Sequence, residues 1–168
     1  MQLHAIEIRR QPFAAAVFLM ACLLPALALS AEDENEITTL NPESLPAPFK
    51  NRFSHGKLVP SGAEWLYTAG QTGRDIDGKI GAGIEEQANF AMRNLYNIVK
   101  EAGMTSNDVI KMTIYYIDPA HLPIIVAARN RYFGDDFRPT STAVGVAALA
   151  NPKYLLEVEL VAARVPGD

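Results

Sequence analysis

The sequence is poor in the residue types that bind zinc or attack as thiols. Its 168 residues include one cysteine and three histidines. A structural or catalytic zinc site draws three or four ligands mainly from these types. His55 and His121 are too far apart along the chain, and on different predicted elements, to suggest a shared site. We therefore expect no metal centre.

The sequence also lacks an excess of basic residues. Fifteen lysines and arginines stand against nineteen acidic residues, so the net charge is −4. A negative protein is repelled by the phosphates of nucleic acids, and the basic residues are mostly dispersed. Arg129, Arg131 and Arg138 could form a small patch, but a solvated helix face explains them equally well. We expect no nucleic-acid partner.

The only long stretch without charge lies at residues 13–29, directly after Arg9 and Arg10. Small residues follow at Ala28 and Ala31, and an acidic run comes next. This order is typical of a secretory signal peptide, which we assign to residues 1–31, with cleavage after Ala28 or Ala31. The protein is thus expected to be secreted or periplasmic.

Three other interpretations of this segment remain open. Seventeen apolar residues reach the lower limit for a membrane-spanning helix, although Pro25 interrupts them. Arg9 and Arg10 loosely fit a twin-arginine signal, and Cys22 resembles a lipoprotein site although an apolar run follows it. Cleavage at Ala31 would remove Cys22 and shift the net charge to −5, leaving a protein without thiols and without stable membrane insertion.

The rest of the chain predicts a flexible lead-in at residues 32–50 and one domain at residues 51–166. Apolar residues at Ile84, Ala88, Ala91 and Leu95 share one helical face. Glu85 and Glu86 suit the first turn of that helix, and Gly103 suits its end. Asp118 and Pro119 predict the start of a second helix, which runs to Phe133. Strands are predicted at 55–59, 64–70, 109–117, 138–149 and 154–165, with a Gly/Asp-rich loop at 71–83. The ββαβαββ order predicts an α+β fold with both helices on one face of a mixed sheet.

Three segments together resemble the RidA (YjgF-like) family of reactive-intermediate deaminases. They are FSHGKLV followed by LYTAGQTG (53–73), NLYNIVKEAGMTSNDVIKMTIYYID (94–118) and RPTSTAVGVAALANPKYLLEVELVA (138–162). The resemblance implies a chorismate-mutase-like fold, a homotrimer with a central barrel, and ligand clefts between subunits. It also implies hydrolysis of small imines and enamines without metal or cofactor.

The resemblance assigns site residues and shows where this chain departs from the family. Glu157 matches the family's cleft acid, but Ser141 stands where active members carry an arginine that binds the substrate carboxylate. Ala143 stands where a cysteine is common, and Phe53 where a tyrosine lines the cleft. Gln71 is a candidate for the cleft wall. We expect these five residues to line the site, with Glu157 as the catalytic acid–base group.

Two functions remain open from the sequence. The first is an exported hydrolase of small imine or related C–N substrates with altered specificity. The second is a non-catalytic trimer that binds a small metabolite or a protein partner in the same clefts. Ser141 weakens the first, because a hydroxyl contributes about 1 kcal/mol where a charged donor contributes about 1.5–3 kcal/mol. Glu157 supports it, although a solvent-facing strand position would also explain that residue.

Overall fold

The computed structural model describes residues 36–166. The predicted signal peptide lies outside the described residues and stays a prediction. The strands are β1 (Thr38–Leu40), β2 (Gly56–Leu58), β3 (Glu64–Tyr67), β4 (Gln71–Thr72), β5 (Val109–Tyr116), β6 (Thr140–Gly145) and β7 (Leu156–Arg164). The helices are α1 (Ile84–Glu101) and α2 (Leu122–Phe133), with short 3₁₀ turns at Phe49–Asn51, Ser106–Asp108 and Pro119–His121.

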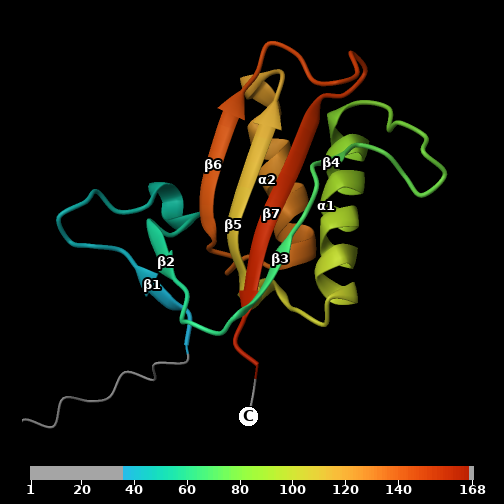
Figure 1. The fold of residues 1–168 in the computed structure, drawn as a ribbon. Helices are drawn as coiled ribbons and strands as arrows, with labels where there is room; N and C mark the ends of the chain where they lie inside the picture. The colour runs from blue at the N-terminus through green and yellow to red at the C-terminus, as the bar shows by residue number, and fades with distance from the viewer. Residues whose placement is uncertain (1–35, 167–168) are drawn as a thin grey trace, which may run out of the picture. The chain divides into compact units, whose positions relative to one another are not determined.

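Five strands form the main sheet, in the order β3-β7-β5-β6, with β4 paired to the other end of β7 (Figure 1). β5 and β6 run parallel, and the remaining pairs are antiparallel. A parallel pair needs a long crossover between its strands, which α2 supplies here. The mixed sheet predicted from the sequence is therefore confirmed.

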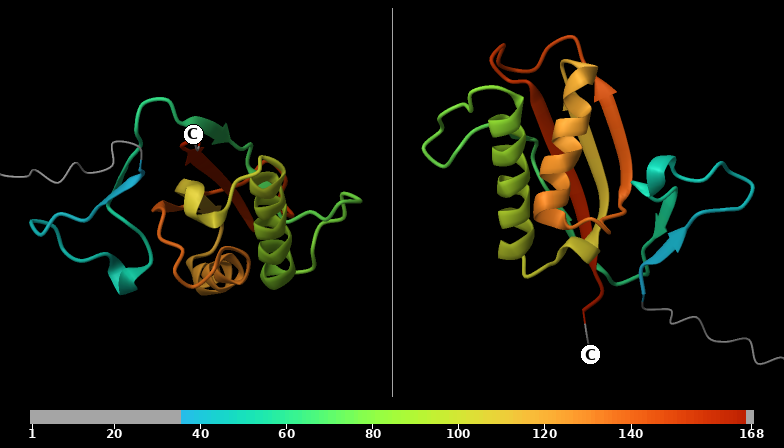
Figure 2. Two further views of the ribbon diagram at one scale, coloured as in Figure 1. Left: turned by 90° about the horizontal axis from the view of Figure 1, so that it is seen from below. Right: turned by 180° about the vertical axis from the view of Figure 1, so that it is seen from behind.

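Both helices cover one face of this sheet and lie side by side (Figure 2, right). The predicted helical face of α1 is confirmed, because its apolar residues are almost fully buried: Ile84, Ala88, Ala91, Leu95 and Val99. On β7 the buried residues alternate with half-exposed ones, starting with Leu156 buried and Glu157 half-exposed. This period of two places every second β7 side chain on the helix-covered face and the others on the open face.

The ends of the helices follow local backbone chemistry. Gly103 follows α1 with φ of 68°, a conformation that glycine adopts without strain, as predicted. Asp118 does accept a hydrogen bond from the Ala120 amide, but the turn that it caps is the 3₁₀ turn Pro119–His121. α2 itself begins at Leu122, so the predicted first helical residue, Pro119, was three residues early.

The segment predicted as a lead-in contains one short strand. Residues 38–40 form β1, which pairs with β2 in a separate two-stranded sheet, so the strand predicted at 55–59 does not join the main sheet. This small sheet lies beside the β6 edge in Figures 1 and 2. A hydrogen bond from the Ser54 amide to the Pro139 carbonyl (3.0 Å) connects the two sheets. β1 has three residues, all exposed, so it has no apolar pattern from which a strand could be predicted.

The open face of the main sheet carries exposed aromatic rings. Trp65 and Tyr67 of β3 stack on each other and are 49% and 71% exposed. Within residues 36–166, no helix is long and apolar enough to span a membrane. Exposed aromatic side chains on one face of a sheet are typical of an interaction surface.

Candidate functional site

The five predicted site residues fall on both faces of the main sheet. In the strand register, Ser141 lies opposite Met112 and Ala143 opposite Ile114, and both partners belong to the buried core. Ser141 and Ala143 therefore point to the helix-covered face. Glu157 lies opposite Tyr115, which follows Ile114 in β5. Because successive strand residues point to opposite faces, Glu157 points to the open face.

Ser141, Ala143 and Phe53 line one cavity of about 240 Å³ at the β6 edge. Its other walls come from α2, from the segment before Phe53 and from β5: Phe49, Arg52, Ile114, Leu122, Val126 and Arg129. The lining is largely apolar, with Ser141 and two guanidinium groups as its polar members. Such a mixture is typical of a small-ligand site.

Hydrogen bonds to the start of β6 hold the segment before the cavity in place. Ser54 is buried, and its Oγ donates to the Arg138 carbonyl at 2.8 Å. Lys50 and Asn51 both have φ of 51°, in the left-handed region that non-glycine residues adopt at a cost. This strained turn carries Phe49, and it brings Phe53 against β6.

Arg129 is the buried cation of this cavity, with 2% of its surface exposed. Burial, followed by the charges of Arg138 and Arg52, lowers the pKa of Arg129 to about 10. Arg138 itself donates to the carbonyls of Asp135 and Phe137 in its own loop. Arg138 therefore does not occupy the place of the arginine that is absent at Ser141.

Sequence reasoning missed Arg52 and Arg129 as cavity residues. A signal for Arg129 was present: it is four residues after Ile125 and four before Phe133, both of which are buried on α2. A charged residue on the buried face of a helix is rare and calls for a partner or a ligand. Arg52 precedes the main sheet in a turn, where no periodicity could have shown its direction.

Glu157 lies on the open face against Gly70, whose missing side chain leaves room for the Glu157 carboxylate. Gly70 is not among the glycines with positive φ, so its backbone conformation does not require glycine. The close approach of the Glu157 side chain does, because a Cβ at this position would clash with it. Thr72 pairs directly with Glu157 and shares its face. Gln71 pairs with Val158 instead, and it lines a separate hollow with Arg74 and Asn94. The structure therefore does not bring Gln71 to Glu157.

A tyrosine and a second carboxylate complete the polar part of the open face. The Tyr115 hydroxyl donates to Glu159 at 3.3 Å. The charge of Glu159, followed by burial, this hydrogen bond and the charge of Glu157, raises the pKa of Tyr115. Tyr115 therefore stays protonated and bound to Glu159 at neutral pH. Among the hydrogen bonds of residues 36–166, none ends on the Glu157 carboxylate, which leaves it available to a ligand.

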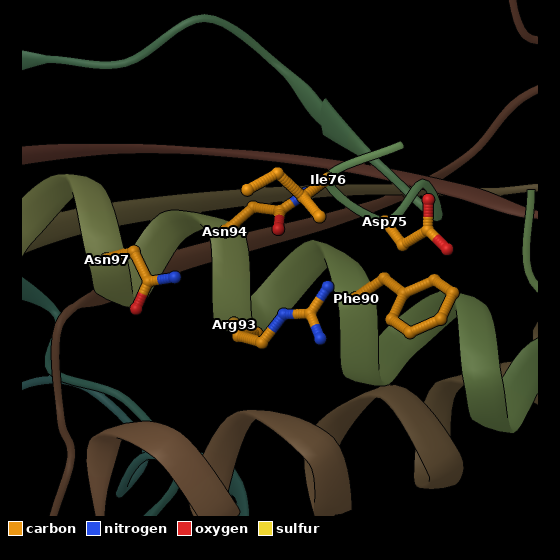
Figure 3. A pocket seen from close by; sticks show the side chains of 6 residues that line it. All are labelled: Asp75, Ile76, Phe90, Arg93, Asn94 and Asn97. Atoms are coloured by element: carbon orange, nitrogen blue, oxygen red, sulfur yellow. The ribbon is translucent and has the colours of Figure 1, made fainter. Parts of the chain in front are cut away.

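A larger hollow of about 610 Å³ lies on the outer side of α1 (Figure 3). Figure 3 shows Arg93 beside Phe90 and the exposed Ile76 of the loop above them. None of the predicted site residues lines it. In the described part of the chain, no three His, Cys, Asp or Glu side chains converge as metal ligands would. The cavity at Ser141 and the Glu157 face are thus the candidate site.

Comparison with known proteins agrees with this fold. The sequence profile of a family described as Endoribonuclease L-PSP matches residues 46–164. The RutC family protein YjgH of Escherichia coli (strain K12) is 32% identical over 102 residues, which are 60% of this chain and 76% of YjgH. The human 2-iminobutanoate/2-iminopropanoate deaminase is 31% identical over 103 residues, 60% of this chain and 74% of the human protein.

A solved structure shows the same architecture. The Rid-family protein YyfB from Yersinia pestis superposes with a TM-score of 0.67 at 28% sequence identity, covering 75% of this chain and 97% of YyfB. This likeness confirms the predicted fold class, an α+β fold with two helices on one face of a mixed sheet. The chain therefore belongs to the Endoribonuclease L-PSP family, the RidA (YjgF-like) family that its motifs resemble.

Proposed function

We propose that this protein is a homotrimeric hydrolase of small imines or enamines, with each active site formed between two copies of the chain. The observation that carries the proposal is the placement of the candidate residues. The cavity at Ser141 opens on the helix-covered side of the β6 edge, whereas Glu157 lies on the opposite face. One chain cannot bring both to one ligand, but a neighbouring copy can present its own Glu157.

The chemistry of such a site is simple. The carbon of a C=N bond is already electrophilic, so water adds to it once the water is positioned and loses a proton. Glu157 would accept that proton and return it to the nitrogen as the carbon–nitrogen bond breaks. Imine and water then give a carbonyl compound and ammonia, with no change in oxidation state. Related proteins support this reaction class, since one is the human 2-iminobutanoate/2-iminopropanoate deaminase.

The exposed aromatic rings of the open face support the trimer. A face with exposed Trp65 and Tyr67 is costly in water and gains stability when another copy covers it. Barrel closure around a central axis would cover the open faces of three chains at once. The loop residue Ile76 is 96% exposed but lies outside this face, so it provides a comparison.

We expect light scattering to give three times the mass of one chain. Tyr67→Asp should shift the protein toward monomer, because it places a charge on the covered face, and Ile76→Asp should leave the mass unchanged. A wild-type protein with the mass of one chain would contradict the shared active site. If Tyr67→Asp and Ile76→Asp had the same mass, the open face would not be part of the interface between copies.

The activity test is direct. Purified protein is incubated with 2-iminopropanoate generated in situ, and the disappearance of the imine is followed with a trapping reagent. We expect loss of the imine well above the rate in buffer. No acceleration would reject this activity and favour the second candidate function, a trimer that binds a small metabolite or protein partner. Ser141 at the arginine position is the observation that favours this alternative.

A further inference from the structure

Arg52 and Arg129 line the cavity, and Arg138 lies close to Arg129; none of the three forms an ion pair within residues 36–166. Arg129 is buried, and Arg52 and Arg138 are close enough to disfavour its charged form. Within residues 36–166, the one ion pair joins Arg164 to Glu64, far from this cluster in the fold. A buried cation without a counter-ion is unfavourable, so the cluster is the electrostatic complement of an anion.

The Arg129 guanidinium is held firmly on one edge. Its Nε and Nη2 donate to the Asn130 Oδ1 at 3.1 and 2.8 Å, and its Nη1 donates to the Arg52 carbonyl at 3.2 Å. Asn130 in turn donates to Asp135, and the Phe137 ring lies 5.6 Å from the guanidinium. A guanidinium carries five N–H donors, so two remain beyond these three bonds. One of them is on Nη1 and the other on Nη2.

That arrangement suits a carboxylate. A guanidinium binds a carboxylate with two parallel N–H donors, and fixing it beforehand lowers the entropy lost on binding. Arg129 lines the same cavity as Ser141, where relatives of the active branch are expected to carry their arginine. The cavity of about 240 Å³ has room for a small organic acid.

We propose that Arg129, assisted by Arg52, binds the carboxylate of the ligand in this cavity and replaces the arginine that is absent at Ser141. The inference rests on the proposed function only in taking this cavity as the substrate site. The ligand class that follows is a small monocarboxylate, such as a 2-imino or 2-oxo acid. Ser141 then donates a neutral hydrogen bond to the ligand, whereas Arg129 supplies the positive charge that binds its carboxylate.

Binding of pyruvate and of its neutral amide, 2-oxopropanamide, to the full chain tests the proposal by calorimetry. Wild type should bind pyruvate and bind the amide at least about tenfold more weakly, because a charged hydrogen bond is lost. Arg129→Met should weaken pyruvate binding about ten- to a hundredfold and leave amide binding nearly unchanged. Arg131→Met is the matched control: it changes an exposed arginine of the same helix that donates to Asn89, and should bind as wild type.

Other variants separate ligand binding from a purely structural role. Arg129→Lys keeps the charge but loses the two-donor edge, so it should bind pyruvate between wild type and Arg129→Met. A structural role would instead weaken pyruvate and amide binding together. Should Arg129→Met fail to fold, the NMR resonance of the Arg129 Nε–H in wild type, expected to shift with pyruvate and not with the amide, decides the question.

The outcomes distinguish this inference from the proposed function. Pyruvate binding that depends on Arg129, in a protein that does not hydrolyse 2-iminopropanoate, would keep the carboxylate site and reject the hydrolase. Hydrolysis with equal affinities of wild type and Arg129→Met would keep the hydrolase and reject Arg129. No pyruvate binding by wild type, or no preference over the amide, overturns the inference whatever the activity assay gives.

Discussion

Glu157→Gln is expected to lower kcat for imine hydrolysis at least about 100-fold, the usual effect of removing a general base. The amide has nearly the same shape as the carboxylate, so it should still fit against Gly70. It cannot accept the proton of water at neutral pH. Initial rates at saturating substrate measure the effect, while light scattering and thermal unfolding should match wild type because Glu157 is half-exposed and makes no hydrogen bond within residues 36–166.

Glu159→Gln provides the matched control for this prediction. Like Glu157→Gln, it removes one negative charge from the open face of β7. Glu159 lies two residues after Glu157, and its carboxylate accepts a hydrogen bond from the Tyr115 hydroxyl. Its activity should stay close to wild type, and the pKa of Tyr115 should fall toward its ordinary value, since Glu159 is the main cause of its rise. Equal losses in both variants would show that the face needs negative charge in general, and would remove Glu157 as the base.

Pyruvate binding gives a second check on the role of Glu157. If the carboxylate of the ligand is bound at Arg129, Glu157→Gln should change kcat while pyruvate affinity changes little. Arg129→Met should do the reverse. A variant of Glu157 that loses pyruvate binding to the same extent as activity would place this residue in ligand binding and not in proton transfer.

The sequence predicted the parts of the fold that depend on periodicity. The apolar face of α1 recurs with the helical period, and β5 and β7 alternate with the period of a strand, so their positions were readable. The two short strands were not. β1 has three exposed residues, and β4 lies within a Gly/Asp-rich loop, so neither has an apolar pattern. Pairing with β2 and β7 creates them, and pairing is a tertiary property.

The candidate site was predicted residue by residue but not as an arrangement. The resemblance to a family supplied Ser141 and Glu157, and only the strand register showed that they point to opposite faces. Within one strand, the sequence alone shows which residues share a face, because side chains alternate. Which residues of two different strands share a face depends on the register in which the strands pair. The same limit explains Gln71, which is one residue out of phase with Glu157 across the β4–β7 pair.

Buried polar residues were the least predictable feature. Gln87 is 2% exposed and lies in the first turns of α1, where no sequence pattern distinguishes it from Glu85 and Glu86. Its Nε2 donates to the carbonyls of Gly81 (3.1 Å) and Lys153 (2.9 Å), and its Oε1 accepts from the Leu155 amide at 2.9 Å. One side chain thus joins the loop before α1 to the loop before β7. These partners are far away in sequence, so no local pattern reveals them.

Gln87→Leu is expected to destabilise the protein by about 3 kcal/mol, because three backbone groups, one buried and two partly buried, lose their partner and each such group costs about 1–3 kcal/mol. The side chains are similar in size, so loss of packing is a minor part of the change. Thermal unfolding should show a fall in Tm of about 10 °C for a domain of this length. Gln71→Leu makes the same substitution where the amide donates only to the nearby Ala69 carbonyl at 3.4 Å, and should leave Tm almost unchanged.

The same variant links stability to the site. Gly73 packs so closely on α1 that a methyl group there would lie 2.6 Å from the Gln87 Cα, and Leu155 lies two residues before Glu157. Gln87 therefore contacts the end of β4, through Gly73, and the residues before β7, through Leu155. These two segments lie on either side of Glu157. We expect Gln87→Leu, assayed well below its Tm, to lose part of its kcat as well as stability, because a displaced general base loses much of its effect. A variant with lowered Tm and unchanged kcat would show that β4 and β7 keep Glu157 in place without this connection.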